Sequence, residues 1–431
     1  MSVTVVGIGA DGWPGLAPPA RTALEKAAVV LGAPRQLDLL PDTVTAERES
    51  WPSPLMPALP GLLDRHARAE LVVLASGDPM FFGIGSTVLR HRPDAAVVGH
   101  PSSLALAAGR LGWTEQDVVT VSAVGRPLAA VRAALAPGRR LLVLADSGET
   151  PRLLAALLVG AGYGQAGMTV LTSLGAEHES RTDGVAADWD APTDDPLAVV
   201  AVACPALPDD DLLGRAPGLP DSAYDHDGQL TKAELRALSV AALRPLPGQL
   251  LWDVGGGAGS IGIEWCRVEP TARAIAIEAR SDRAGRITAN AETLGVPALR
   301  VVEGRAPEAL AGLDAPDAVF VGGGVSVSGM LDTCRTALRA GGRLVANAVT
   351  IEGEAALAAA LGEHGGTIRR IAVSRATPVG RYLGWKALAP VTQWVLHVGP
   401  DGGGGPGARN DSLQALDVRE PSSITPPWRN S

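Results

Sequence analysis

The residues best suited to chemistry form an acidic and glycine-rich segment in the second half of the chain, LLWDVGGGAGSIGIEWCR, which begins at Leu250. Its apolar start predicts a strand that ends near Asp253, and its apolar end predicts a helix. Gly255, Gly257 and Gly259 stand between the two, and glycines in such a turn let a ligand approach the backbone closely. The helix N-terminus adds N–H donors and partial positive charge, so the turn suits a ligand with an anionic group.

Two cofactors fit this turn. The spacing D-x-G-x-G-x-G is typical of S-adenosylmethionine sites, whereas Gly257, Gly259 and Gly262 also satisfy G-x-G-x-x-G, the dinucleotide pattern. Asp253, ahead of the first glycine, favours S-adenosylmethionine over NAD. Glu278 ends the next predicted strand, where a carboxylate can accept hydrogen bonds from both ribose hydroxyls. A glycine-rich turn without a cofactor, as found in many α/β proteins, is the structural alternative.

Later segments extend the same predicted site. In EGRAPEAL, Arg305 stands where many methyltransferases have an acid for the adenine amine, so Ala306 is expected to contribute through its backbone. The fourth predicted strand ends in a glycine run at 322–324, at the edge where such folds open to substrate. The other predicted cofactor-binding residues of this half are Thr231, Ser260, Gly322 and Gly323.

The first half begins with a glycine loop of its own, GIGADGWPGL. Gly7, Gly9 and Gly12 have dinucleotide spacing. The next predicted strand nevertheless ends at Leu31 without the acid that NAD requires, and the segment 13–15, Trp-Pro-Gly, prolongs the loop. NAD is therefore disfavoured at this loop.

Two further segments of the first half could surround a ligand. Gly77, Asp78 and Pro79 predict a tight turn directly after a strand. Ser102 and Ser103 stand at the start of an apolar helix, where a hydroxyl can cap the first backbone N–H groups. Turn and cap roles alone would also account for Asp78 and the serines.

These residues require strands that place them at one edge of a sheet. Short apolar runs alternate with Ala- and Leu-rich helical stretches, which is typical of parallel α/β sheets buried on both faces. In the first half, strands are predicted at 3–6, 29–31, 71–75, 141–145, 169–172 and 198–202, and a helix at 20–28. In the second half, a helix at 232–243 precedes strands at 249–254, 274–277, 300–302, 318–321, 343–346 and 393–398, the rhythm of a doubly wound sheet.

A cluster of prolines and aspartates divides the chain near residue 210. We expect one domain at 1–207, a linker at 208–229 and a second domain at 230–399. The glycine-rich, polar tail at 400–431 is predicted to be disordered.

Composition excludes several classes of protein. The 431 residues carry a net charge of −9 and no basic run with interleaved aromatics, so nucleic acid is not an expected partner. The three cysteines are far apart and form no C-x-x-C pair, so neither a disulfide framework nor a metal site is expected. Without a leader or an apolar run long enough for a membrane span, the sequence predicts a soluble cytoplasmic protein that does not bind membranes.

The three segments of the first half together resemble the tetrapyrrole (corrin/porphyrin) methylase family. In that family they surround S-adenosylmethionine in a cleft between two α/β lobes. The resemblance implies cofactor binding by residues that match the family's motifs, namely Gly7, Gly9, Gly77, Asp78, Pro79, Ser102 and Ser103. Ala10-Asp11-Gly12 departs modestly from the family, whose loop usually has more Gly and Pro there.

The second half resembles the Rossmann-type corrinoid methyltransferases that also remove a carboxylate. The segment GLPDSAYDHDGQLTKAELRAL, residues 218–238, and the later SRATPVGRYLGWKALAPVTQW carry this resemblance, with Gly256 where the family often has Ala. The fold implied is a two-lobed methylase followed by a Rossmann-like class I methyltransferase with a doubly wound sheet. Two S-adenosylmethionine sites are implied, one in each half.

The order of the two halves resembles fused enzymes of cobalamin biosynthesis. It implies methylation of a precorrin at C5 by the first half, and C15 methylation with loss of the ring C acetate carboxylate by the second. A homo-oligomer is expected, because related enzymes tend to associate. Another tetrapyrrole or small molecule as the substrate, an NAD-linked oxidoreductase and a non-catalytic nucleotide-binding protein are the alternatives.

The methyl group of S-adenosylmethionine is already activated, so the protein need only position carbon, methyl and sulfur in line. Acid–base groups can assist decarboxylation, and Arg side chains can pair with substrate carboxylates. The catalytic candidates are His226, Asp227, Lys232, Asn347 and Arg381, and the arginines considered for substrate carboxylates are Arg126, Arg375 and Arg381.

Overall fold

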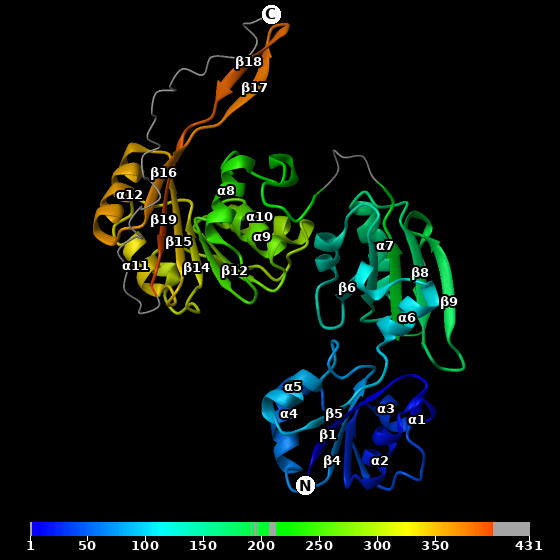
Figure 1. The fold of residues 1–431 in the computed structure, drawn as a ribbon. Helices are drawn as coiled ribbons and strands as arrows, with labels where there is room; N and C mark the ends of the chain where they lie inside the picture. The colour runs from blue at the N-terminus through cyan, green and yellow to red at the C-terminus, as the bar shows by residue number, and fades with distance from the viewer. Residues whose placement is uncertain (1, 191, 194, 196, 207–212, 400–431) are drawn as a thin grey trace, which may run out of the picture. The chain divides into compact units, whose positions relative to one another are not determined.

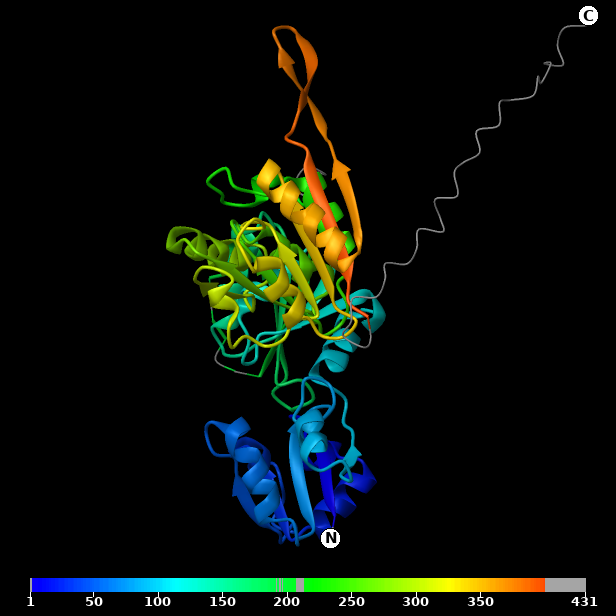
Figure 2. The ribbon, with the colours of Figure 1, turned by 90° about the vertical axis from the view of Figure 1, so that its left-hand side faces the viewer.

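The computed structural model describes residues 2–190, 192–193, 195, 197–206 and 213–399 (Figures 1 and 2). The chain divides into two compact units, Met1–Leu213 and Gly214–Ser431. Each unit has its own sheets and its own hydrophobic clusters. The tail that the sequence predicts to be disordered, 400–431, lies outside the described residues.

Unit 1 begins with a five-stranded parallel sheet of order β3-β2-β4-β1-β5. Helices α4 and α5 cover one face and α1 to α3 the other, which buries β1 and β4 on both sides (Figure 1). The strands are β1 (Val3–Ile8), β2 (Val29–Gly32), β3 (Glu47–Ser50), β4 (Leu71–Ser76) and β5 (Ala96–Val98). The helices are α1 (Gly12–Gly15), α2 (Pro18–Lys26), α3 (Pro34–Asp38), α4 (Leu55–Arg65) and α5 (Gly85–His91).

The second sheet of unit 1 is mixed rather than parallel, with order β6-β7-β10-β8-β9. β10 is antiparallel to both β7 and β8, which corrects the parallel arrangement expected from their continuous apolar runs. Burial on both faces explains the runs regardless of strand direction: Val143 and Val200 face one apolar cluster, whereas Leu142 and Val199 face another. The elements are α6 (Ser103–Leu111), η1 (Glu115–Asp117), β6 (Val118–Ser122), η2 (Leu128–Ala134), β7 (Arg140–Leu144), α7 (Thr150–Gly160), β8 (Gly167–Thr172), β9 (Ser180–Val185), η3 (Ala186–Asp188) and β10 (Ala198–Ala203).

Unit 2 is a doubly wound, seven-stranded sheet of order β13-β12-β11-β14-β15-β19-β16. Its first five strands are parallel, and β19 is antiparallel to both β15 and β16. The strands are β11 (Leu250–Val254), β12 (Arg273–Glu278), β13 (Arg300–Glu303), β14 (Ala318–Val321), β15 (Arg343–Ala348), β16 (Thr367–Ile371) and β19 (Val391–His397).

Helices cover both faces of this sheet. α8, α9 and α10 pack on one apolar cluster and α11 and α12 on the other (Figure 1). The helices are η5 (Asp221–Ala223), α8 (Ala233–Leu243), α9 (Ser260–Val268), α10 (Ser281–Thr293), η6 (Glu308–Leu310), α11 (Met330–Ala337) and α12 (Ile351–His364). Among the described residues, no helix combines the length and the apolar character that crossing a bilayer requires.

A hairpin of β17 (Ser374–Val379) and β18 (Tyr382–Ala387) extends beyond the sheet of unit 2, as both ribbon views show (Figures 1 and 2). It is a two-stranded sheet of its own.

The segment that enters unit 2 is fixed by a buried ion pair. Arg236 on α8 is fully buried, and its Nε lies 2.5 Å from Oε1 of Glu264 on α9, which is also buried. Glu264 accepts hydrogen bonds from the backbone N–H groups of Gly218 and Leu219 and from the hydroxyl of Tyr224. Leu219 and Tyr224, which fall within the predicted linker, are therefore part of the core of unit 2.

The Arg236→Ala variant should destabilise unit 2 by about 3–5 kcal/mol, because it leaves the Glu264 carboxylate buried without its charge partner. Urea unfolding followed by tryptophan fluorescence measures this loss. Arg280→Ala removes an exposed ion pair with Asp282 and should leave the transition almost unchanged. Equal effects of the two substitutions would contradict the structural role given to the buried pair.

Candidate cofactor sites

The glycine turn after β11 brings two loops of unit 2 into backbone contact. Gly255 has φ 74°, and a Cβ atom there would lie 2.9 Å from the backbone nitrogen of Gly323. The amide of Gly322 donates to the carbonyl of Val254, which fixes the end of β14 beside the end of β11. The structure therefore brings the predicted residues Gly255, Gly322 and Gly323 together.

Helix α9 begins directly after this turn. Gly259 is its N-cap, with φ 79°, and Ser260 is its first residue and is buried. Gly257, two residues before this N-cap, donates its N–H to Oε2 of Glu278 at 2.9 Å. The glycine cradle, the helix N-terminus and the nearby carboxylate suit a ligand with an anionic end and ribose hydroxyls, as S-adenosylmethionine has.

Asp253 lies inside the unit rather than on its surface. Its side chain is 1% exposed, and Oδ2 accepts a hydrogen bond from the N–H of Gly262 in α9 at 3.0 Å. Burial raises the pKa of Asp253 to about 7, and the nearby Glu278 carboxylate adds to this effect. Asp253 thus fixes the helix that follows the turn, and its contact with a cofactor stays a prediction.

Glu278, at the end of β12, connects three backbone segments. Besides Gly257, its side chain accepts from the N–H of Arg280 at 3.0 Å, and its carbonyl accepts from the N–H of Gly304. Ala306 follows Gly304 and packs against the core cluster, half-buried. The loops after β12 and β13 are thereby held beside the glycine turn, as a pocket for ribose and adenine would require.

The segment that enters unit 2, residues 218–231 (the entry segment), also reaches the glycine turn after β11. The carbonyl oxygen of Gln229 lies 3.3 Å from the position of a Cβ at Gly257, and Asn290 of α10 bonds both Asp225 and the carbonyl of Ala258. Thr231, the next predicted site residue, is held by its carbonyl, which accepts from the guanidinium of Arg236. The buried ion pair therefore positions the segment that borders the glycine turn.

In unit 1 the predicted residues meet at a cavity of about 600 Å³, within the usual size range of small-molecule sites. Gly9, Gly77, Ser102 and Ser103 line it, and they come from three loops that are far apart in sequence. Two glycines and two serines with little side-chain bulk leave room for a ligand to contact the backbone. The residues present therefore fit the cofactor that the sequence predicts.

Gly7, Asp78 and Pro79 lie outside the lining, and local backbone contacts fix the loops to which the predicted residues belong. A Cβ at Gly7 would lie 2.3 Å from the carbonyl oxygen of Gly77, so β1 and β4 can converge only with glycine there. Asp78 accepts from the N–H of Met80 at 2.7 Å, and the carbonyl of Pro79 accepts from Gly85. Ser102 caps α6 by accepting from the N–H of Ala105. Turn and cap roles are thus present alongside the predicted site.

Sequence reasoning missed a histidine beneath the first glycine loop. His100 is 8% exposed, and its Nε2 lies 3.1 Å from a carboxylate oxygen of Asp11. A Cβ at Gly9 would lie 2.5 Å from Cε1 of His100, so the pair packs directly against the loop that lines the cavity. No spacing rule connects two residues this far apart in sequence, although the departure at 10–12 marked the loop as unusual.

The catalytic candidates of unit 2 come from several separate elements. Asn347 belongs to a polar network with Ser239 and Gln393, and Lys232 lies 4.0 Å from Asp221. Arg381 lies in the turn of the β17–β18 hairpin, with its guanidinium 5.0 Å from the Tyr382 ring centroid.

The other two candidates lie in the entry segment. His226 accepts from the N–H of Gly228, and Asp227 pairs with Arg283 at 2.8 Å. Of the arginines considered for substrate carboxylates, Arg375 is occupied by Glu234 and Asp221. The catalytic roles of His226 and Asp227, and the substrate contacts of the arginines, stay predictions.

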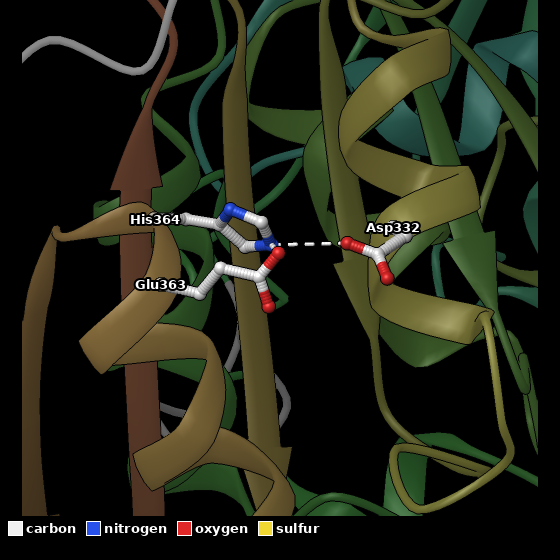
Figure 3. A group of neighbouring side chains, drawn as sticks. All are labelled: Asp332, Glu363 and His364. Atoms are coloured by element: carbon white, nitrogen blue, oxygen red, sulfur yellow. Dashed lines mark hydrogen bonds and ion pairs between the residues drawn. The ribbon is translucent and has the colours of Figure 1, made fainter.

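One cluster of potential metal ligands lies in unit 2, at Asp332, Glu363 and His364 (Figure 3). Nε2 of His364 lies 3.0 Å from Asp332, and both carboxylates are exposed. His364 ends α12 and Asp332 lies in α11, so we interpret the group as a hydrogen-bonded contact between these two helices.

Comparison with known proteins identifies the family. A family model of tetrapyrrole (corrin/porphyrin) methylases matches residues 2–189, and a precorrin methyltransferase domain model matches residues 222–398. A Sinorhizobium protein named precorrin-6Y C(5,15)-methyltransferase [decarboxylating] is 48% identical over 91% of this chain and 95% of its own. The chain belongs to the precorrin-6Y C(5,15)-methyltransferase family.

A second relative carries the same name, and one solved structure is similar over part of the chain. A Mycobacterium tuberculosis (strain CDC 1551 / Oshkosh) protein of the same name is 46% identical over 91% of this chain and 99% of its own. The crystal structure of the C-terminal domain of precorrin-6Y C5,15-methyltransferase from Rhodobacter capsulatus is 47% identical, covers 43% of this chain and 100% of its own, and has a TM-score of 0.41. The predicted family, fold class and methyltransferase activity are confirmed, and the NAD-linked alternative is disfavoured.

The Asp253→Asn variant should become more stable relative to the native protein as the pH rises from 5 to 8. Between about pH 4 and pH 7 the folded protein keeps a proton on Asp253 that the unfolded chain has lost, so this group's contribution to stability falls as pH rises. Asn keeps an acceptor for Gly262 and has no proton to lose. The expected change in the difference between the two unfolding free energies is roughly 1–3 kcal/mol, measured by urea unfolding.

The matched control is Asp282→Asn, because hydrogen bonds from Arg280 lower the pKa of the exposed Asp282 and keep it ionised at both pH values. Its stability difference from the native protein should be the same at pH 5 and pH 8. If Asp253→Asn behaves like the control, Asp253 is not buried with a raised pKa.

Proposed function

We propose that this protein uses S-adenosylmethionine to methylate precorrin-6Y at C5 and C15 and decarboxylates the ring C acetate, giving precorrin-8X in cobalamin biosynthesis. One observation carries the proposal above all. Relatives with this named activity match 91% of the chain, across both the methylase half and the precorrin methyltransferase half.

Two cofactor sites are part of the proposal. The glycine and serine cavity of unit 1 would hold one S-adenosylmethionine, and the glycine turn of unit 2, with Glu278, would hold the other. A solved relative, uroporphyrin-III C-methyltransferase from Thermus thermophilus, was crystallised with S-adenosylhomocysteine and is 26% identical. We assign C5 methylation to unit 1, and C15 methylation with decarboxylation to unit 2.

The protein's part in the chemistry is to position and to desolvate. S-adenosylmethionine supplies an activated methyl group, so no nucleophile from the chain is required. The carboxyl ends of β1 and β4, and of β11, β12 and β14, hold the backbone loops that would orient the cofactor. Orientation of the acceptor carbon, methyl and sulfur in line then provides most of the rate enhancement.

We further propose a cytoplasmic homo-oligomer. All three cysteines, Cys204, Cys266 and Cys334, are free and buried, which suits a reducing compartment. The β17–β18 hairpin exposes four large apolar side chains, at 62–79%, and a two-stranded sheet has little stability on its own. These side chains are Val379, Tyr382, Leu383 and Trp385.

Mass spectrometry of the product formed from precorrin-6Y and S-adenosylmethionine tests the activity. The native protein should add two methyl groups and release carbon dioxide. Gly77→Val and Gly255→Val should each remove the methylation of their own unit, because the added side chain meets the backbone of Ser102 or of Gly323. Gly255→Val should also abolish decarboxylation.

Gly109→Val and Gly362→Val are the controls, since both positions have open space around them. Both should retain the full product. A native protein that binds S-adenosylmethionine but leaves the mass of precorrin-6Y unchanged would refute the proposed substrate.

Replacement of Trp385 by Ser should reduce the oligomer, because it removes exposed apolar surface from the hairpin. Analytical ultracentrifugation measures the mass of the particle. Ile351→Ser, at an equally exposed position on α12, should leave the assembly intact. A native protein that sediments as a monomer would contradict the proposed assembly.

A further inference from the structure

Two aromatic side chains line the unit 1 cavity at one place, and the backbone of one of them is strained. These are Phe81 and Phe82, each 44% exposed, with ring centroids 5.0 Å apart in an edge-to-face arrangement. Phe82 has φ 57°, a left-handed backbone conformation that is rare for a bulky side chain. Such outliers persist where the surrounding structure enforces them, and they cluster at ligand sites.

The loop around Phe82 enforces this conformation. Asp78 accepts from Met80, and the carbonyl of Pro79 accepts from Gly85 at 2.9 Å. A Cβ at Gly83 or Gly85 would lie 2.6 Å from that same carbonyl oxygen, so the loop cannot relax by shifting past Pro79. The strain therefore presents two aromatic rings to the cavity instead of burying them in the core.

Arg126 does not line the cavity itself, but it places a positive charge beside Phe82, which does. Its guanidinium carbon lies 5.3 Å from the centroid of the Phe82 ring, a cation–π distance. Its side chain is exposed, and in the described part of the chain it has no carboxylate partner. Asp146, in the loop after β7, accepts from the N–H of Gly125, the residue before Arg126.

The same cavity holds the predicted cofactor residues Gly9, Gly77, Ser102 and Ser103. A methyl donor and its acceptor must lie in contact, so the remaining aromatic end is the place for the acceptor. A flat, conjugated and polyanionic ring needs apolar faces to stack on and cations near its carboxylates. Arg35 also lines the cavity and adds a second guanidinium.

We propose that Phe81, Phe82 and Arg126 form the macrocycle-binding surface of unit 1, with the phenyl rings against the flat face of the tetrapyrrole and the guanidinium beside its carboxylates. This inference rests on the proposed function, since it assigns the substrate's place in that site. It explains why a strained aromatic loop follows the Gly77–Pro79 turn.

The chain allows a local test, because it contains only three phenylalanines, Phe81, Phe82 and Phe320. Phe320 is 2% exposed in the core of unit 2, so its signal does not report on the unit 1 cavity. The full chain labelled with 4-fluorophenylalanine, with each resonance assigned by substitution, should give three fluorine NMR signals. Precorrin-6Y added to protein already saturated with S-adenosylhomocysteine should shift the signals of Phe81 and Phe82.

Two variants sharpen the test. Arg126→Ala should require about tenfold more precorrin-6Y for half of the shift, a typical effect of losing one charged contact. Arg140→Ala removes an arginine 5.3 Å from the ring of Trp113, a residue that does not line the cavity, and should leave the titration unchanged. Phe82→Gly should unfold at a temperature no lower than Phe82→Ala, because glycine tolerates the positive φ.

Unmoved Phe81 and Phe82 signals at the highest precorrin-6Y concentration would overturn the inference, as would an unchanged Arg126→Ala titration. A parallel sample that contains S-adenosylmethionine in place of S-adenosylhomocysteine separates this inference from the proposed function. Shifted Phe81 and Phe82 signals without methyl transfer in the parallel sample would refute the proposed function but leave the macrocycle surface standing. Methyl transfer in the parallel sample with unmoved Phe81 and Phe82 signals would refute the macrocycle surface but leave the proposed function standing.

Discussion

Two stretches of main chain lie closer together at the carboxyl ends of the central strands than any side chain allows. In unit 1, a Cβ at Gly7 would lie 2.3 Å from the carbonyl oxygen of Gly77. In unit 2, a Cβ at Gly255 would lie 2.9 Å from the backbone of Gly323. Because glycine occupies these positions, neighbouring loops meet and leave backbone-lined space beside them. The rest of each site depends on this contact.

Buried charge in unit 2 is used to fix backbone rather than to perform acid–base chemistry. Asp253, Glu264 and Glu278 all accept hydrogen bonds from backbone N–H groups, and only Glu264 has a buried cationic partner. Burying carboxylates is costly, as the raised pKa of Asp253 shows. The benefit is a rigid turn, which a reaction that depends on alignment requires.

The sequence predicted the central strands well because they are continuous apolar runs between glycine turns. The strand predicted at 318–321 matches β14, and 71–75 matches all but the last residue of β4. The strands that it missed include β5, β6 and β16. It also missed β3, β9 and the β17–β18 hairpin, whose residues are largely exposed and carry no apolar run. Strand direction in the second sheet was equally hidden, since burial on both faces produces the same pattern in parallel and antiparallel strands.

Part of each candidate site could be predicted because glycines and helix caps act through their own backbone, so the local sequence reveals them. The His100–Asp11 pair, the Arg236–Glu264 pair and the Phe82–Arg126 contact join residues distant in sequence, and only the fold brings them together. The segment from Leu219 to Tyr224 was expected to be linker because it continues a stretch rich in proline and aspartate, although two of its residues belong to the core.

The number of cofactors bound per chain tests most directly whether both units bind S-adenosylmethionine. Isothermal titration of the full chain with S-adenosylhomocysteine should give two sites, one for each glycine-built cradle. If the native protein shows a single site, and Gly77→Val or Gly255→Val leaves binding at that site unchanged, the claim that both units bind the cofactor is contradicted.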